Sequence, residues 1–248
     1  MIAFDDVYKS FGANHVLRGV DLTVGKGESM VIIGGSGTGK SVLIKTVLGL
    51  LKPDSGTIRV EGRNVAEGER DAFLARFGML FQGGALFDSL SVWQNVAFRL
   101  LRGKLRRPRT EARAIALEKL RRVGLRENVA DLYPGELSGG MQKRVGLARA
   151  IAAEPEIIFF DEPTTGLDPI MAGVINELIR EIVVEMGVTA MTITHDMSSV
   201  HAIADHVAML HEGRVQWTGP IGNMDHSGDP CLDQFINARA NGPIEAVR

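Results

Sequence analysis

A glycine-rich octapeptide at residues 34–41 constrains this chain more than any other segment. It lies between an apolar strand-like run at 28–33 and a run typical of a helix that extends to Leu50. Glycines let the backbone curl so that successive N–H groups point at phosphate oxygens. Lys40 would bring a charge to the terminal phosphates, and the Ser41 hydroxyl suits Mg²⁺. The segment therefore predicts a triphosphate-binding loop whose helix turns its positive dipole end toward the anion. A strand-to-helix turn without a ligand is the alternative.

A second helix start offers another set of uncovered N–H groups. Ser138 is a natural N-cap, and Gly139 and Gly140 leave the backbone accessible in the first turn of the helix that follows. The pattern indicates a second anion site, far along the chain from residues 34–41. Taken alone, such a motif is more often a plain helix cap.

Two carboxylates follow the apolar run at 157–160. Asp161 is placed to organise Mg²⁺ and its waters, and Glu162 is placed to polarise an attacking water. Turn formation before Pro163 is the alternative for such an acidic pair. In a chain that also carries a phosphate loop, the pair favours phosphoryl chemistry.

In this order the motifs resemble those of the ATP-binding cassette subunits of ABC transporters, and the resemblance covers nearly all of the chain. It implies an α/β P-loop NTPase fold with a RecA-like core, an antiparallel β lobe and a helical sublobe at about 83–153. The ABC domain would occupy residues 1–225, and residues 226–248 would form a tail for subunit or partner contact.

The resemblance also implies a role for each motif residue. Gln82, Glu162 and His195 would be catalytic, with ATP as the substrate and Mg²⁺ held by Ser41, Gln82 and Asp161. Met141 stands where the family most often has glutamine, which should not impair a site that acts through serine and glycine N–H groups. The nucleotide-binding residues would be Phe11, which stacks on adenine, Gly34, Gly35, Ser36, Gly37, Thr38, Gly39, Lys40, Ser41, Val42, Ser138, Gly139, Gly140 and Asp168.

Composition agrees with a cytosolic ATPase. The 248 residues are 45% apolar, which is enough for a large core. A net charge of −2 gives no push toward nucleic acid, and one cysteine, Cys231, allows no internal disulfide. We expect no signal peptide and no membrane helix, so that a membrane role requires a partner that spans the bilayer.

The resemblance extends to a subgroup. The segment 81–92, with Gly83, Gly84 and Phe87, lies where the family contacts its membrane subunit, and it is similar to the ATPases of MCE-type (Mla) phospholipid transporters. The stretches 233–237 and 242–244 resemble the tail of that group. This implies a head-to-tail homodimer on the cytoplasmic face of the inner membrane. Permease subunits, an MCE-type lipid-binding protein and a regulatory STAS-domain protein would be its partners, and nucleic acid would not.

Other functions stay open. An importer of small polar solutes is the nearest alternative. A soluble ABC ATPase acting on DNA or ribosomes usually carries two cassettes or a long coiled coil, and neither is present. A purely regulatory nucleotide-binding module is disfavoured by the intact Glu162.

Two further segments carry expectations. Residues 99–122 hold ten basic side chains and two acidic ones, which predicts a solvated helix face or, alternatively, a face toward anionic lipid headgroups. In the tail, Leu232, Phe235 and Ile236 share one face of a short helix between 229 and 239. A helix this short must dock to be stable, on its own chain, on the sister subunit or on a partner. The remaining histidines show no metal-binding spacing.

Overall fold

A computed structural model describes residues 2–67 and 70–245, and the chain divides into two compact units. The first unit comprises residues 1–67 and 193–248, and the second comprises residues 68–192. Position 1 and positions 68–69 of the predicted ABC domain, and 246–248 of the predicted tail, lie outside the described residues. The second unit is larger than the predicted sublobe because strands from both ends of that segment pack with its helices. The domain bounds stay a prediction.

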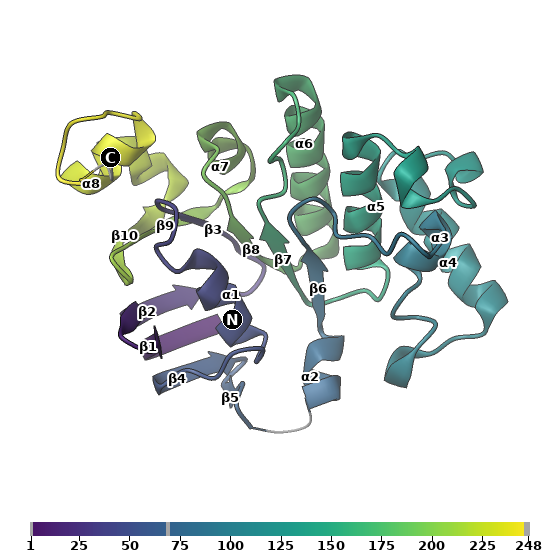
Figure 1. The fold of residues 1–248 in the computed structure, drawn as a ribbon, viewed down its shortest axis with the longest axis horizontal. Coiled ribbons are helices and arrows are strands. Elements are labelled where there is room, and N and C mark those ends of the chain that lie inside the picture. Colours follow the sequence, from purple (N-terminus) through teal and green to yellow (C-terminus); the bar gives the residue numbers. More distant parts are fainter. Residues whose placement is uncertain (1, 68–69, 246–248) are drawn as a thin grey trace. The chain divides into compact units, whose positions relative to one another are not determined.

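The first unit contains a four-stranded antiparallel sheet in the order β2-β1-β4-β5, drawn in purple and blue in Figure 1. One face of β1 is buried through Ile2 and Phe4, which follow the two-residue period of a half-buried strand, and through Val7. Val7 lies three residues after Phe4 because the pairing register with β2 shifts between them. The strands of this sheet are β1 (Ile2–Phe11), β2 (Asn14–Val24), β4 (Ser55–Val60) and β5 (Arg63–Asn64).

The same unit holds three further strands in the order β10-β9-β3. β3 (Ser29–Ile33) is fully buried and runs parallel to β9 (His206–His211), which forms an antiparallel hairpin with β10 (Arg214–Pro220). Buried parallel strands read as continuous apolar runs, which is why β3 could be recognised in the sequence. The remaining elements of the unit are α1 (Lys40–Val47), α7 (Met197–Ile203), the 3₁₀ turn η4 (Ile221–His226) and α8 (Pro230–Ile236).

The second unit places three strands, in the order β8-β7-β6, with a set of helices drawn in blue, teal and green in Figure 1. β6 (Phe77–Leu80) pairs in parallel with β7 (Ile157–Asp161) and packs against α5. Helices α3, α4 and α5 pack on one another, and α6 carries an apolar face that includes Ile175 and Ile179. The other elements are β8 (Thr189–Ile193), α2 (Arg70–Ala75), α3 (Val92–Val96), η1 (Gly103–Leu105), α4 (Arg109–Arg122), η2 (Glu127–Val129), η3 (Pro134–Glu136), α5 (Gly139–Ile151) and α6 (Pro169–Met186).

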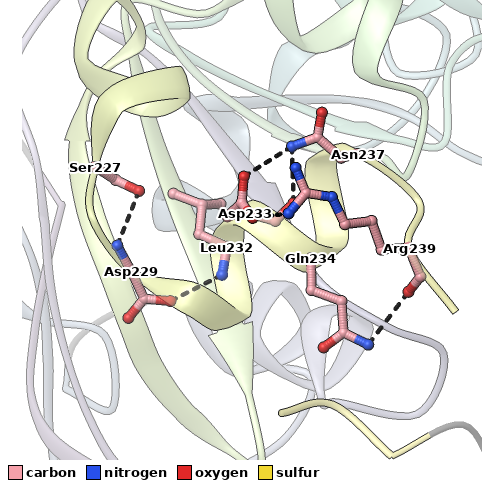
Figure 2. A network of polar contacts seen from close by, with 7 residues as sticks. All are labelled: Ser227, Asp229, Leu232, Asp233, Gln234, Asn237 and Arg239. Atoms are coloured by element: carbon pink, nitrogen blue, oxygen red, sulfur yellow. Dashed lines mark hydrogen bonds and ion pairs between the residues drawn. The ribbon is translucent and has the colours of Figure 1, made fainter. Parts of the chain in front are cut away.

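The tail helix α8 docks on its own chain, against β10 and η4. Leu232 is fully buried there, and the Asp229 carboxylate caps the helix by accepting from the Leu232 N–H at 2.8 Å. Gln234 is also buried, and its amide donates to the carbonyl of Arg239, so that the chain beyond the helix folds back (Figure 2). Phe235 and Ile236 are only partly buried. Of the three expected docking partners, the structure shows the chain itself.

Among the described residues, the structure holds no helix with the length and apolarity needed to cross a bilayer.

Candidate functional site

The phosphate-loop sequence forms the connection between β3 and α1. Lys40 is the first residue of α1, and its Nζ donates to the carbonyls of Gly34 and Gly35, each at 2.7 Å. The Thr38 hydroxyl donates to the Gly35 carbonyl at 3.0 Å and closes the loop. The N-cap of α1 is Gly39, which offers no side-chain cap. The N–H groups at this helix start are therefore accessible to an anion.

Glycine at position 34 is required by both conformation and space. Its φ is +145°, a value that favours glycine, and a Cβ there would lie 2.2 Å from the Leu210 carbonyl oxygen. Gly37 and Gly39 also have positive φ, of +78° and +104°. A Cβ on Gly39 would touch Val16 and Leu17 of β2 at 3.0–3.1 Å, whereas one on Gly37 would meet nothing within 4 Å.

His195 lies beside the strand that leads into this loop. The Thr194 N–H donates to the carbonyl of Ile32, at 3.3 Å, so that the chain before His195 is tied to the end of β3. The His195 side chain is exposed. Phe11 ends β1, is 48% exposed, and has the Lys9 Nζ 5.6 Å from its ring centroid. An exposed aromatic ring can stack on a base, as the resemblance implies for this position.

The two predicted carboxylates lie at the end of β7 in the second unit. Asp161 is the last residue of the strand, and Glu162 follows with a φ of +49°, which is uncommon for a residue other than glycine. The Thr165 hydroxyl donates to the Glu162 Oε2 at 2.9 Å. The carboxylate that the sequence assigned to water activation is thus held within the turn that follows the strand.

The second predicted anion site also lies at a helix start in this unit. Ser138 caps α5 by accepting from the Met141 N–H at 3.3 Å, and both Ser138 and Gly139 are exposed. Asp168 caps α6, its Oδ1 accepting from the N–H groups of Ile170 and Met171 at 3.0 Å. The two helix starts approach each other, because a Cβ on Gly140 would lie 2.8 Å from the Met171 methyl group. The structure therefore brings the helix start of the second predicted anion site close to the helix start that Asp168 caps.

Gln82 begins the turn after β6 and is exposed. The residues just beyond it are fastened to α5, because Arg149 donates to the carbonyls of Gly84 and Ala85 at 2.6 and 2.8 Å. Burial lowers the pKa of Arg149. Gly146 faces Gly84, and a Cβ there would meet the Gly84 Cα at 3.3 Å. The backbone that follows Gln82 is therefore anchored to α5.

One buried side chain shapes the segment predicted to contact a membrane subunit. Asn95 accepts from the Phe87 N–H at 2.8 Å and donates to the carbonyls of Phe87, Leu90 and Ser91 at 3.0–3.1 Å. The Phe87 ring is 44% exposed and stacks on Phe98 at a centroid distance of 4.4 Å. The loop is thus rigid and presents an aromatic side chain to solvent.

Most of the basic segment is solvated, in line with the expected solvated face, because seven of its ten basic side chains are exposed. Three are not: Arg99 and Arg122 are partly buried, and Lys119 is buried. Arg99 donates to the carbonyls of Leu74 and Phe77, and its burial lowers its pKa. Lys119 is 4% exposed and pairs with Glu118 and Glu154. Four further arginines line a cavity of about 690 Å³, with Leu90, Gln94, Leu101 and Pro108; they are Arg102, Arg106, Arg107 and Arg109.

Sequence reasoning assigned no function to Lys143, Thr165, Arg149 or Asn95. Each acts on a motif by hydrogen bonding to its backbone or side chain from another turn or helix. The one available signal was Lys143, a cation at a position where the period of α5 expects an apolar residue. The roles assigned to the motif residues themselves stay predictions.

Comparison with known families gives a match that includes the phosphate loop, Gln82, the second helix start and the carboxylate pair. The family model described as "ABC transporter" matches residues 17–165.

Curated relatives align along nearly the whole chain. The intermembrane phospholipid transport system ATP-binding protein MlaF of Escherichia coli is 38% identical, over 98% of this chain and 91% of that protein. The protein TRIGALACTOSYLDIACYLGLYCEROL 3, chloroplastic, of Arabidopsis thaliana is 39% identical, over 98% of this chain and 75% of the relative. The probable ribonucleotide transport ATP-binding protein mkl of Mycobacterium tuberculosis is 39% identical over 98% and 68%.

Solved structures share the fold. The dimeric ATP-binding cassette MJ0796 in a post-hydrolysis state, bound to ADP and Pi, has a TM-score of 0.80 at 30% identity, covering 89% of this chain and 99% of that one. The cbiO1 subunit from Clostridium perfringens, part of the transporter complex cbiONQ, has a TM-score of 0.81 at 30% identity, covering 96% and 94%. The predicted fold class is thereby confirmed.

Proposed function

The chain belongs to the ABC transporter family, and on this premise we propose that it hydrolyses ATP to power the movement of phospholipid between membranes. ATP binding and hydrolysis are characteristic of the family. The observation that carries the lipid assignment is the alignment with MlaF, which leaves only 9% of that relative unmatched. The tail is included in this alignment, and so is the segment around Phe87.

In the proposed reaction each unit supplies its own set of residues. The loop N–H groups and Lys40 hold the phosphates, and Phe11 stacks on the base. Ser41, Gln82 and Asp161 would hold Mg²⁺, which neutralises charge that develops on the phosphates. These donors fit the ion, because hydroxyl, amide and carboxylate oxygens are the ligands that Mg²⁺ prefers.

Glu162 is the proposed general base. Its carboxylate accepts a proton from water as the water oxygen bonds to the γ-phosphorus and ADP leaves. His195 and Gln82 would contact the γ-phosphate and so respond to whether it is bound. The positive φ of Glu162 supports a functional role, because strained backbone conformations cluster at functional sites, where the surrounding structure holds them in place.

Substitution of two residues separates binding from chemistry. Glu162→Gln should retain ATP binding and lower kcat by at least about 100-fold, because the phosphate-binding residues remain while the base is lost. Lys40→Ala should instead weaken ATP binding. Wild-type turnover by Glu162→Gln in a phosphate-release assay would refute the role of Glu162.

The active unit is proposed to be a head-to-tail homodimer. Ser138, Gly140 and Asp168 of one subunit would complete the nucleotide site of the other, as the paired helix starts of α5 and α6 allow. Ser138→Arg should leave ATP binding by the monomer intact and abolish hydrolysis.

Mixing Ser138→Arg with Lys40→Ala subunits tests this arrangement. A mixed dimer contains one site with both defects and one site with neither, so partial ATPase activity should return. Full activity of Ser138→Arg alone would exclude the assignment to the partner subunit.

The membrane partner is proposed to be a permease that receives the 81–92 segment. Phe87 projects from a loop that Asn95 holds in shape, which suits a surface that must present one conformation. The protein would then be peripheral, on the cytoplasmic face of the inner membrane. Phe87→Asp should reduce recovery of the permease from detergent extracts while ATPase activity of the isolated subunit stays unchanged.

Two cargoes can be distinguished by experiment. A relative named for ribonucleotide transport favours the alternative, an importer of small polar solutes. Purification of the intact complex from membranes, followed by mass spectrometry of bound chains and lipids, should yield a permease, an MCE-type protein and phospholipid. Recovery of a solute-binding protein without lipid would favour the importer.

The tail is proposed as a contact for a STAS-domain protein. Leu232 is buried in the same chain, so contact with a partner would use the exposed parts of Phe235 and Ile236 on the same helix face. Removing residues 229–248 should weaken dimerisation or partner recovery. Unchanged oligomer mass by light scattering and unchanged partner recovery would confine the tail to a role in its own chain.

A further inference from the structure

Helix α5 carries a lysine on its buried face. Gly140, Lys143 and Leu147 are all buried and recur at the spacing of one helix side. Lys143 is 3% exposed, although lysine is almost never fully buried without a partner. Packing alone would favour an aliphatic residue here, so the cation calls for a polar explanation.

The polar partner of Lys143 is the backbone of the proposed general base. Its Nζ donates to the carbonyl oxygen of Glu162 at 3.0 Å. Burial lowers the pKa of Lys143, while the charges of Glu162 and Asp161 raise it, and the net shift is downward. The nitrogen carries hydrogens to donate in either protonation state.

This hydrogen bond acts on a strained residue. Glu162 has a φ of +49°, a conformation that is unfavourable for a non-glycine residue and needs support from its surroundings. Thr165 holds the side chain through Oε2, and Lys143 holds the peptide plane on the carbonyl side. Two independent contacts therefore define where the carboxylate points.

We propose that Lys143 is a positioning residue: by donating a hydrogen bond from α5 to the Glu162 carbonyl, it orients the Glu162 carboxylate toward the attacking water. The inference rests on the proposed role of Glu162 as base. Lys143 is buried, and its Nζ donates to the Glu162 carbonyl, so in this proposal it acts through Glu162.

The central experiment replaces the amine by an apolar chain of similar length. Lys143→Met should lower kcat by about 10-fold with the KM for ATP within about twofold of wild type, since a small error in aim affects the chemical step and not binding. Lys143→Arg keeps N–H donors at a similar reach and should restore most of the rate.

The sharper measurement combines two substitutions. If Lys143 works only through Glu162, adding Lys143→Met to Glu162→Gln should leave the residual single-turnover rate unchanged. Lys119→Met is the matched control, because Lys119 is equally buried in the same unit but pairs with Glu118 and Glu154. It should lower thermal stability similarly without changing kcat.

The outcomes separate this inference from the function on which it rests. Full turnover by Glu162→Gln removes the general base and the inference together. Loss of turnover in Glu162→Gln with a wild-type rate in Lys143→Met overturns the inference alone. The inference also falls if Lys143→Met slows the Glu162→Gln background by the same factor, or if Lys119→Met lowers kcat as much.

Discussion

The phosphate loop of the first unit and the Glu162 turn of the second solve the same backbone problem differently. Both need positive φ at a residue that follows a buried strand. The loop uses glycine, as at Gly34, where no side chain could fit against Leu210. The turn keeps a glutamate and surrounds it with Lys143 and Thr165.

The difference follows from what each segment presents. The loop offers N–H groups, so a side chain would add nothing and would obstruct the ligand. The turn offers a carboxylate, so the side chain has to stay and its strain must be met by neighbouring contacts. At these two sites, therefore, glycine serves recognition by the backbone, and a supported glutamate at positive φ serves chemistry by the side chain.

Gly34→Ala should produce the largest effect. Its Cβ would lie 2.2 Å from a backbone oxygen, so the loop must shift and its N–H groups with it. We expect ATP affinity to fall by at least about 100-fold in a titration with a fluorescent ATP analogue. Gly37→Ala is the control, because it meets nothing within 4 Å and bears only a backbone cost of about 1–2 kcal/mol. Equal dissociation constants for both variants would contradict the role of close packing.

Thr165→Val tests the other half of the comparison. The change removes the donor to Glu162 Oε2 and keeps the shape of the side chain. Loss of one of two supports should lower kcat by about 10-fold with little change in KM. Steady-state ATPase kinetics measure this, and Thr164→Val beside it provides a control for packing in the same turn. A raised KM at unchanged kcat would assign Thr165 to binding.

Glu162→Gly compares the two solutions directly. Glycine accepts the positive φ of +49° at no steric cost. The free energy of unfolding of this variant should therefore exceed that of Glu162→Gln by about 1 kcal/mol. Its turnover should remain as low as that of Glu162→Gln. Urea unfolding of the two variants gives the difference, and a less stable glycine variant would show that the contacts of the glutamate side chain outweigh its strain.

Asp196 holds a turn of the first unit through its side chain. Of the substitutions considered, its replacement should have the smallest effect, a small loss of stability. Burial raises the pKa of its carboxyl, but hydrogen bonds from Ser198 and Ser199 outweigh this and lower the pKa below its usual 3.8. The carboxylate therefore stabilises the fold above pH 3.8, and this contribution is lost as pH falls through the lowered pKa.

Asp196→Asn should remove that dependence. We expect it to destabilise the protein by about 0.5 kcal/mol at pH 7, and the difference from wild type should shrink as the pH falls below 3.8. Urea unfolding as a function of pH gives the answer. A difference that is constant with pH would assign the effect to capping geometry instead of charge.

The sequence allowed the phosphate loop, the buried strands and the carboxylate pair to be predicted, because local chemistry alone specifies them. Gly34 and Glu162 are recognisable from their neighbours along the chain. Lys143 and Asn95 are not, since their importance comes from partners 19 and eight residues away that only the fold brings close. The hydrogen bonds of Arg99 could not be predicted for the same reason, because its acceptors are carbonyls more than 20 residues earlier.

The docked tail gives the protein a built-in probe. Cys231, the single cysteine of the sequence, lies in the first turn of α8, and burial together with the charges of Asp229 and Glu212 raises the pKa of its thiol. A docked thiol of this kind reacts slowly with maleimides, because the thiolate is the reacting species. Any event that lifts α8 away from β10 should accelerate labelling. The kinetics of one chemical modification, without mutagenesis, would then report the position of the tail throughout the ATP cycle.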